Sequence, residues 1–321
     1  PAFGGLDAAK TVREAAVNSG PVQLDPNVTL TNADGTGFGG GRLTVSIAGA
    51  TAADSFSIRE ADGITVAGNG VYYQGTRIGT VTSDGAAGSA LTVAFDSGPV
   101  SNQAATALAR SVSYSSTSDA PGAAARAVTF QAVDAEKTAG AARMNLKIAA
   151  DRDAPQVSGL DAHMVRTPQE ALTARLVDGD VTARNPDGTG FSGGSLNVHL
   201  DGATAGDDLT LASGPFRIQG TKVFLGATHV ANVTASGQDG TDLTIKFKAA
   251  AKVSDAQMTQ LMEQVAHSTS DAAPPEGERT LTFTLTDKEG DVTRASVGLT
   301  VAQPNRAPVA TDDARTTAED T

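Results

Sequence analysis

Apolar and polar residues alternate along most of this chain. Leu43–Ile47 (LTVSI) and Leu196–Leu200 (LNVHL) carry an apolar side chain at every second position. Because successive side chains of a β-strand point to opposite faces, this period of two predicts strands with one buried and one exposed face. The same pattern predicts strands at four further segments: Val71–Val81, Leu91–Phe95, Val128–Val133 and Met144–Ile148.

Turn signals separate the predicted strands. They are pairs in which Asp or Asn precedes Gly, the residues that best tolerate the left-handed backbone of tight hairpin turns. The clearest are Asp62-Gly63, Asn69-Gly70, Asp84-Gly85 and Asp239-Gly240. Many short strands joined by tight turns are therefore expected.

One segment has a helical period instead. Ser254 and Gln257 have the spacing of a capping box, which satisfies free N–H groups at a helix start. Apolar residues then recur at intervals of three and four, the stripe of an amphipathic helix: Met258, Leu261, Met262 and Val265. The equivalent segment earlier in the chain is Ser101–Val112, with Leu108 and Val112 on its stripe.

The chain repeats itself. Asp34–Phe38 (DGTGF) recurs as Asp187–Phe191, a shift of 153 residues (187 − 34), and other strand-like segments recur in the same register. The extended joint Asp151–Val157 returns in degenerate form as Asn305–Val309. We therefore expect one unit at residues 1–153, a second at 154–306, and the start of a third at 307–321, so that the chain is a piece of something longer.

Composition fits an all-β fold and narrows the function. Of 321 residues, 40% are hydrophobic but only 4% aromatic, so Val, Leu, Ile and Ala must build the cores. The predicted fold is a pair of tandem β-sandwiches, each with one short helix. The net charge of −12 argues against a nucleic-acid partner, which needs a basic surface. Cysteine is absent, and no run of 18 apolar residues predicts membrane insertion.

Signals of catalysis are weak. All four histidines belong to the second unit: His163, His199, His229 and His267. The glycine-rich stretch Gly35–Gly41 lacks the lysine of a phosphate-binding loop, and a strand follows it rather than a helix. No serine lies in a Gly-x-Ser-x-Gly elbow. We predict that the protein is not an enzyme.

Three segments resemble a known class of repeats: Arg110–Asp119 followed by Ala127–Asp134, Arg279–Asp287, and Asn305–Asp313. They are similar to the tandem cadherin-like or Ig-like repeats of large bacterial surface proteins, including giant adhesins and calcium-dependent type I secreted proteins. This resemblance implies stacked sandwiches outside a Gram-negative cell, secreted or at its surface. It also implies Ca²⁺ at the joints between units.

The resemblance further implies which acids could hold Ca²⁺, an ion that takes six to eight oxygen ligands. At the first joint they are Glu14, Asp151, Asp153, Asp178 and Asp180. At the second joint Pro304 and Arg306 replace the linker acids, and the candidates are Glu170, Asp287, Glu289, Asp291, Asp312 and Asp313. The alternative is that these acids are solvated turn residues, a common role of Asp beside Gly.

Three functions remain open on the sequence. The first is a structural segment that spaces or stiffens a cell-adhesion protein, with neighbouring repeats of the same chain as its partners. The second is an adhesion module that binds a surface glycan or another protein through exposed loops. The third is self-association into a filament or surface layer through strand edges.

Overall fold

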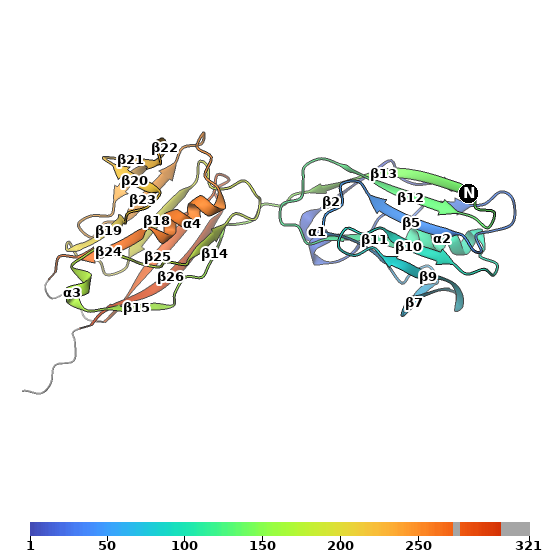
Figure 1. Ribbon diagram of the computed structural model, residues 1–321, viewed down its shortest axis with the longest axis horizontal. Helices are drawn as coiled ribbons and strands as arrows, with labels where there is room; N and C mark the ends of the chain where they lie inside the picture. Colours follow the sequence, from blue (N-terminus) through green and yellow to red (C-terminus); the bar gives the residue numbers. More distant parts are fainter. Residues whose placement is uncertain (272–276, 303–321) are drawn as a thin grey trace, which may run out of the picture. The chain divides into compact units, whose positions relative to one another are not determined.

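The computed structural model describes residues 1–271 and 277–302 of the chain (Figure 1). The chain divides into two compact units, Pro1–Asp153 and Ala154–Thr321. Each is an all-β sandwich with few helices, as the alternating pattern predicts. The expected third repeat, 307–321, lies outside the described residues.

The first unit consists of a large sheet, a small sheet and a short two-stranded ribbon. The eight-stranded sheet has the order β2-β13-β12-β5-β10-β9-β8-β7, the three-stranded sheet the order β3-β11-β6, and β1 pairs with β4. The bounds are β1 Ala2–Gly4, β2 Ala9–Arg13, β3 Val22–Gln23, β4 Thr29–Thr31, β5 Arg42–Ile47, β6 Asp54–Ile58, β7 Ile64–Ala67, β8 Gly70–Tyr73, β9 Thr76–Asp84, β10 Leu91–Phe95, β11 Val112–Ser116, β12 Arg126–Val133 and β13 Ala139–Ala149.

The second unit repeats this topology strand for strand. Its sheets have the orders β15-β26-β25-β18-β23-β22-β21-β20 and β16-β24-β19, and β14 pairs with β17. The bounds are β14 Gln156–Ser158, β15 His163–Arg166, β16 Arg175–Leu176, β17 Thr182–Arg184, β18 Ser195–Leu200, β19 Asp207–Leu211, β20 Phe216–Gln219, β21 Lys222–Leu225, β22 Thr228–Ser236, β23 Leu243–Phe247, β24 Val265–Thr269, β25 Glu278–Thr286 and β26 Val292–Val301. The repeat seen in the sequence is thus a repeat of the fold.

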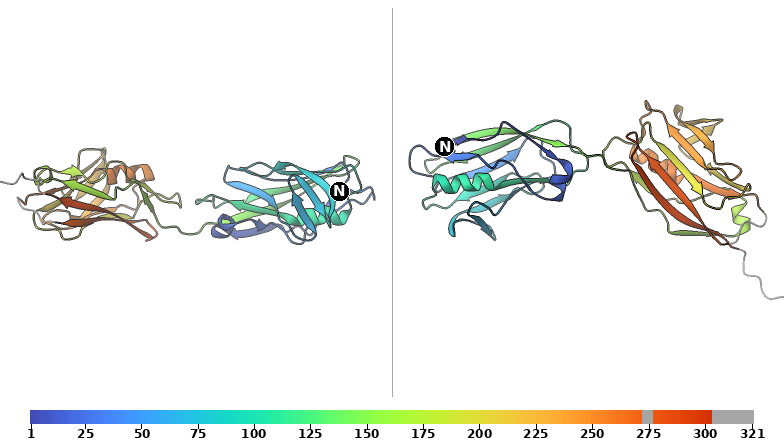
Figure 2. Two further views of the ribbon diagram at one scale, coloured as in Figure 1. Left: turned by 90° about the horizontal axis from the view of Figure 1, so that it is seen from below. Right: turned by 180° about the vertical axis from the view of Figure 1, so that it is seen from behind.

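One main helix packs into each sandwich where the sequence predicts it. These are α2 (Asn102–Ser111) and α4 (Asp255–Glu263), and Figure 2 shows α2 lying along the first sandwich. Ser254 and Gln257 form the predicted capping box of α4. Met258, Leu261 and Met262 are fully buried, so the predicted stripe faces the core.

Two local predictions need correction. Each unit has a second short helix, α1 (Glu14–Ser19) and α3 (Pro168–Ala171), too short to produce an apolar period. In addition, Val71–Val81 is a hairpin rather than one strand. Gln74 and Gly75 have φ of 50° and 80°, the backbone of a tight two-residue turn between β8 and β9.

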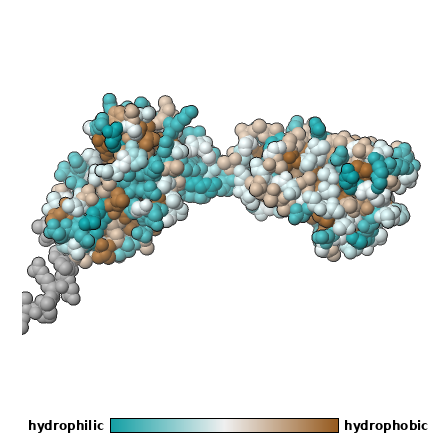
Figure 3. All heavy atoms as spheres, viewed as in Figure 1, coloured by the Kyte–Doolittle hydropathy of each residue, from teal (hydrophilic) through white to brown (hydrophobic). Residues whose placement is uncertain are grey.

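Aliphatic residues and a few phenylalanines fill the cores. The largest fully buried side chains include Phe38 and Phe130 in the first unit and Phe191 and Phe283 in the second. On the face in Figure 3, hydrophobic residues appear singly or in small groups among hydrophilic and intermediate ones. Among the described residues, no helix is both long and apolar enough to cross a membrane.

Candidate metal centres

Each unit has a cluster of three carboxylates at equivalent positions. In the second unit they are Asp187, Asp287 and Glu289, each with an oxygen within 4.8 Å of the others. In the first unit they are Asp34, Asp134 and Glu136, at the same separation. Oxygens around one Ca²⁺ at 2.3–2.6 Å can lie at most about 5 Å apart, so each cluster matches the size of such a site.

The DGTGF loop brings the first acid into each cluster. In the second unit, the buried Asn185 side chain donates to Gly190 O at 2.8 Å and accepts from Asp187 N at 3.1 Å. Asn32 makes the same contacts around Asp34. Gly190 has φ of 64°, and a Cβ there would lie 2.3 Å from Val253 O, so only glycine fits.

A hairpin supplies the other two acids. Asp287 Oδ1 accepts a hydrogen bond from Asp291 N at 2.9 Å in the β25–β26 turn. Asp287 is only 2% exposed, and its buried Oδ2 has no hydrogen-bond partner within residues 1–271 and 277–302. A buried carboxylate oxygen without a partner is costly, and a bound cation would remove that cost.

The carboxylate at the equivalent position of the first unit is Asp134. Asp134 is fully buried and its Oδ1 accepts from Thr138 N at 2.8 Å, while its Oδ2 has no hydrogen-bond partner in the described part of the chain. The N-terminal ammonium of Pro1 lies 3.7 Å from Oδ2.

A separate acidic group surrounds Glu14. This residue begins α1 and is 2% exposed. Its Oε2 accepts from Asp151 N at 2.9 Å, and none of the described residues forms a hydrogen bond with its buried Oε1. Asp151 Oδ2 in turn accepts from Ala15 N at 2.8 Å. Burial raises the pKa of Glu14, and repulsion from Asp153, Asp151 and Asp119 raises it further.

Asp178 and Asp180 join Asp161 in a third type of cluster, again with oxygens within 4.8 Å. Burial alone would raise the pKa of Asp178, but hydrogen bonds from the N–H groups of Asp161, Asp180 and Val181 outweigh it and lower that pKa. The Asp178 carboxylate raises the pKa of Asp180 beside it. Asp25 accepts from the equivalent N–H groups in the first unit, so Asp178 has a structural role in the loop.

Of the described acids predicted for the second joint, Glu170 lies far from the other three. Glu170 caps α3, next to β15, whose Arg166 lies opposite Val301 at the end of β26. The opposite end of β26, a ten-residue strand about 33 Å long, begins at Val292. Just before it, in the turn from β25, lie Asp287, Glu289 and Asp291. Asp312 and Asp313 lie outside the described residues.

Sequence reasoning missed five cluster residues: Asp34, Asp134, Glu136, Asp161 and Asp187. A signal was present, because all three acids of one cluster recur at the shift of 153 residues. The DGTGF repeat looked like a strand connection, which it is, since Gly35–Gly41 lies between β4 and β5. Its proximity to the hairpin acids depends on the fold and cannot be found by spacing alone.

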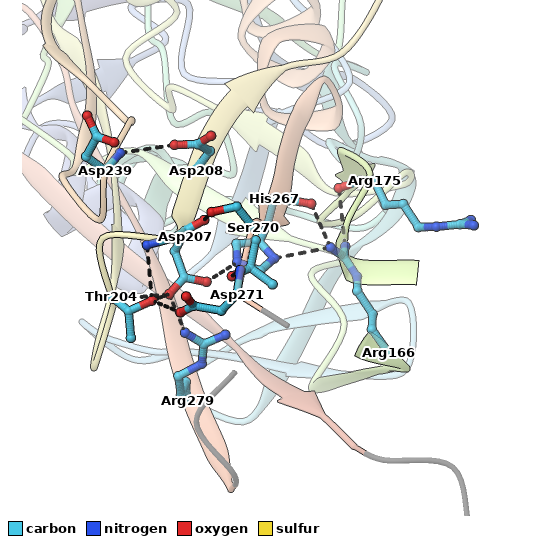
Figure 4. A network of polar contacts seen from close by, with 12 residues as sticks. Arg166, Arg175, Thr204, Asp207, Asp208, Asp239, His267, Ser270, Asp271 and Arg279 are labelled. Atoms are coloured by element: carbon cyan, nitrogen blue, oxygen red, sulfur yellow. Dashed lines mark hydrogen bonds and ion pairs between the residues drawn. The ribbon is translucent and has the colours of Figure 1, made fainter. Parts of the chain in front are cut away.

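A buried charged network lies apart from these clusters (Figure 4). Asp207 Oδ1 lies 2.9 Å from His267 Nε2, and Arg279 Nη1 donates to Asp207 Oδ2 at 2.7 Å. In the first unit Asp54 takes the same position, with Tyr114 in place of His267 and Arg126 in place of Arg279. In both units the network links the small sheet to the large sheet. The histidine is not common to the two units, because Tyr114 takes its place in the first.

No protein-family model matches the chain, and no curated protein sequence does either. Several solved structures align with this chain. Protocadherin Gamma B2 extracellular cadherin domains 3–6 align at 12% identity and a TM-score of 0.31, over 94% of this chain and 47% of that one. This chain thus spans about half of that protein's length. Human CDH23 EC21-23 aligns at 12% identity and a TM-score of 0.29, over 94% of this chain and 69% of that one.

A bacterial structure is also similar. The C-terminal domain of the Streptococcus agalactiae AgI/II polypeptide BspA aligns at 11% identity and a TM-score of 0.23, over 82% of this chain and 85% of that one. At such values the similarity assigns no function to this chain.

Proposed function

We propose that this chain is a structural tandem-repeat segment of an extracellular or cell-surface protein of the adhesin type, whose sandwich units bind Ca²⁺. The observation that carries the proposal is a buried carboxylate oxygen at the same place in both clusters, on Asp134 and Asp287, that has no hydrogen-bond partner among the described residues. An ion at each cluster would pair the orphaned oxygen and fix the DGTGF loop to the hairpin. Stiff ends suit a unit that stacks on its neighbours.

Further acids support cation binding at the end of the first unit. Glu14 presents a buried oxygen that no described residue pairs by a hydrogen bond, beside Asp151 and within the electrostatic reach of Asp153 and Asp119. We propose that Ca²⁺ binds here as well. In the second unit, exposed Asp161 and Asp180 lie together in a cluster of their own, and Asp178 holds their loop.

Thermal unfolding of the whole chain with calcium and with chelator tests the proposal. At 10 mM Ca²⁺ and a Kd of about 1 mM, typical of extracellular modules, mass action adds about 1.4 kcal/mol per site. For a unit of this size the Tm should rise by about 3–6 °C. Magnesium at 10 mM should have less effect, because it requires a tighter octahedral site.

Variants locate the sites. Glu136→Gln with Glu289→Gln should abolish most of the calcium shift without disturbing the fold, since neither side chain is buried. The matched control is Asp62→Asn with Asp201→Asn, two exposed acids outside the clusters. An unchanged Tm in calcium, or a shift that the control pair removes equally, refutes the assignment.

A further inference from the structure

The first unit has a cavity where three of its segments meet. These segments are the DGTGF loop, the hairpin of β8 and β9, and the start of α2. Figure 1 shows β9 beside α2, and residues of both line the cavity. Its volume is about 460 Å³. Small-molecule sites commonly have volumes of about 300–1,000 Å³, so the cavity is large enough for a small ligand.

Tyr73 forms an aromatic wall of this cavity. It ends β8, opposite Ile64 of β7, and its half-buried side chain packs against the core of the unit. Gly63 leaves space for the ring, because a Cβ at that position would lie 3.3 Å from Tyr73 Cε2. Ile78 and Pro99 also line the cavity. A ligand in it would therefore meet an apolar surface.

Three hydroxyl groups in the cavity have an O–H donor to offer. Thr36 Oγ1 accepts from Asn32 Nδ2 at 3.1 Å. Ser101 Oγ accepts from an N–H group in the first turn of α2 at 3.2 Å, and Tyr73 Oη accepts from Gln74 Nε2 at 3.3 Å. Among the described residues, none of these hydroxyls donates a hydrogen bond. All three can therefore donate to the oxygens of a ligand.

The cavity favours a neutral ligand. Within residues 1–271 and 277–302, no charged side chain lines it. An anion would find neither lysine nor arginine there, and Asp34, which directly precedes the lining residue Gly35, would repel it. A sugar ring has the complementary features: oxygens that accept hydrogen bonds around its rim, and C–H groups on its faces that pack on an aromatic ring.

The second unit differs at the same place. The strand registers place Leu225 where Tyr73 stands. The helix caps place Gln257 where Ala104 stands, and Gln257 Oε1 accepts from Ser254 N at 3.0 Å, so its side chain folds back over the start of α4. The equivalent cavity is smaller, about 380 Å³, and no residue of the β21–β22 hairpin, all of which is described, lines it. The fold therefore does not require the open cavity of the first unit.

We propose that this cavity binds a neutral hexose at the end of a glycan. One face of the sugar ring packs on Tyr73, and the sugar oxygens accept hydrogen bonds from Thr36, Ser101 and Tyr73. This binding activity is separate from calcium binding, because none of the described cluster acids lines the cavity. The first unit would thus recognise a ligand as well as space its neighbours.

Saturation-transfer difference NMR of the 321-residue chain tests the proposal. The probes are the methyl glycosides of glucose, galactose and mannose. At the ligand efficiency of ordinary small ligands, at least one of them should bind with a Kd of about 1 mM. Transfer should be strongest to the C–H protons of one ring face. The methyl glycoside of glucuronic acid, which adds a carboxylate, should bind more weakly.

Variants locate the site. Tyr73→Leu with Ala104→Gln installs the residues of the second unit and should weaken binding at least about tenfold, because it removes the aromatic wall and fills part of the cavity. The matched control is Tyr72→Phe, which installs the equivalent Phe224 at a position that does not line the cavity and should leave the affinity unchanged. If the double variant does not unfold cooperatively, Tyr73→Leu alone replaces it.

The other outcomes overturn the proposal. These are no binding of any neutral glycoside up to about 10 mM, ten times the expected Kd, and binding that persists in the double variant. Tighter binding of the glucuronide would assign the cavity to an anion. A hexaproline peptide is the last probe, because aromatic-lined grooves also bind proline-rich segments. If it binds at Tyr73 and no glycoside does, the cavity is a peptide site.

Discussion

Asp54 shows how one carboxylate secures the first sandwich. It lies on β6, is 2% exposed, and accepts two hydrogen bonds from Arg126 at 2.8 and 2.7 Å, besides those from Tyr114 and Thr51. Burial alone would raise the pKa of Asp54, but these hydrogen bonds outweigh it and lower the pKa to about 2. The residue therefore links the small sheet, through β6 and β11, to β12 of the large sheet.

Acid should unfold the first unit partly through Asp54. Because its folded pKa of about 2 lies below the ordinary value of 3.8, its contribution is complete above pH 4 and is lost as the pH falls through 2. The amount is about 2 kcal/mol. Urea unfolding between pH 2 and 7 should show this slope, and Asp54→Asn should flatten it.

The same substitution should destabilise the unit by roughly 3–5 kcal/mol at pH 7, because it leaves Arg126 without its partner. Tyr114→Phe, which removes only a hydroxyl, should cost about 1–2 kcal/mol. Equal costs for both variants would mean that the charge of Asp54 is unimportant.

Glu14 should behave in the opposite way. Its folded pKa is raised above 4.5, so the calcium-free first unit loses stability as the pH rises from 4.5 through the folded value. Glu14→Gln should remove this loss and stabilise the calcium-free protein at pH 7. In saturating calcium the order should reverse, since the amide lacks the charge that binds the ion. Thermal unfolding of the unmodified protein and of Glu14→Gln, in chelator and in calcium, measures which of the two is more stable in each condition.

Prediction from sequence succeeds for elements whose own residues carry the pattern. The α4 helix has both a capping box and a buried stripe, and β10 begins and ends where the alternation does. The short helix α1 has no side-chain cap and is held by Asp151, a residue far away in the sequence. The cluster of Asp187 with Asp287 likewise depends on strand pairing, so its members cannot be grouped from the sequence alone.

The apolar stripe of α4 gives a direct test at the scale of a single element. Leu261→Ala should destabilise the second unit by roughly 2–5 kcal/mol, because Leu261 is fully buried. Gln260→Ala, one position away and exposed, should change stability by less than about 0.5 kcal/mol. Chemical denaturation monitored by circular dichroism compares the two. Similar losses would show that the stripe does not face the core.

At the scale of the molecule, the two units repeat one topology but differ at the end where each chain leaves its last strand. The first unit has Glu14 there, hydrogen-bonded to Asp151, whereas the second has Pro168 in the place of Glu14. The clusters of Asp34 and Asp187, in contrast, occur in both units and each lies within a single unit. Calcium binding at these clusters should therefore not depend on the partner unit.

Separate expression of residues 1–153 and 154–306 tests this independence. Each segment contains a complete core, so each should unfold cooperatively with a β-type circular dichroism spectrum. Each should also keep a calcium-dependent rise in Tm, because Asp34, Asp134 and Glu136 stay together in one segment, and Asp187, Asp287 and Glu289 in the other. A calcium shift seen only in the intact chain would place the ions between the units and contradict binding within each cluster. Loss of cooperative unfolding in both segments would show that neither unit is a domain.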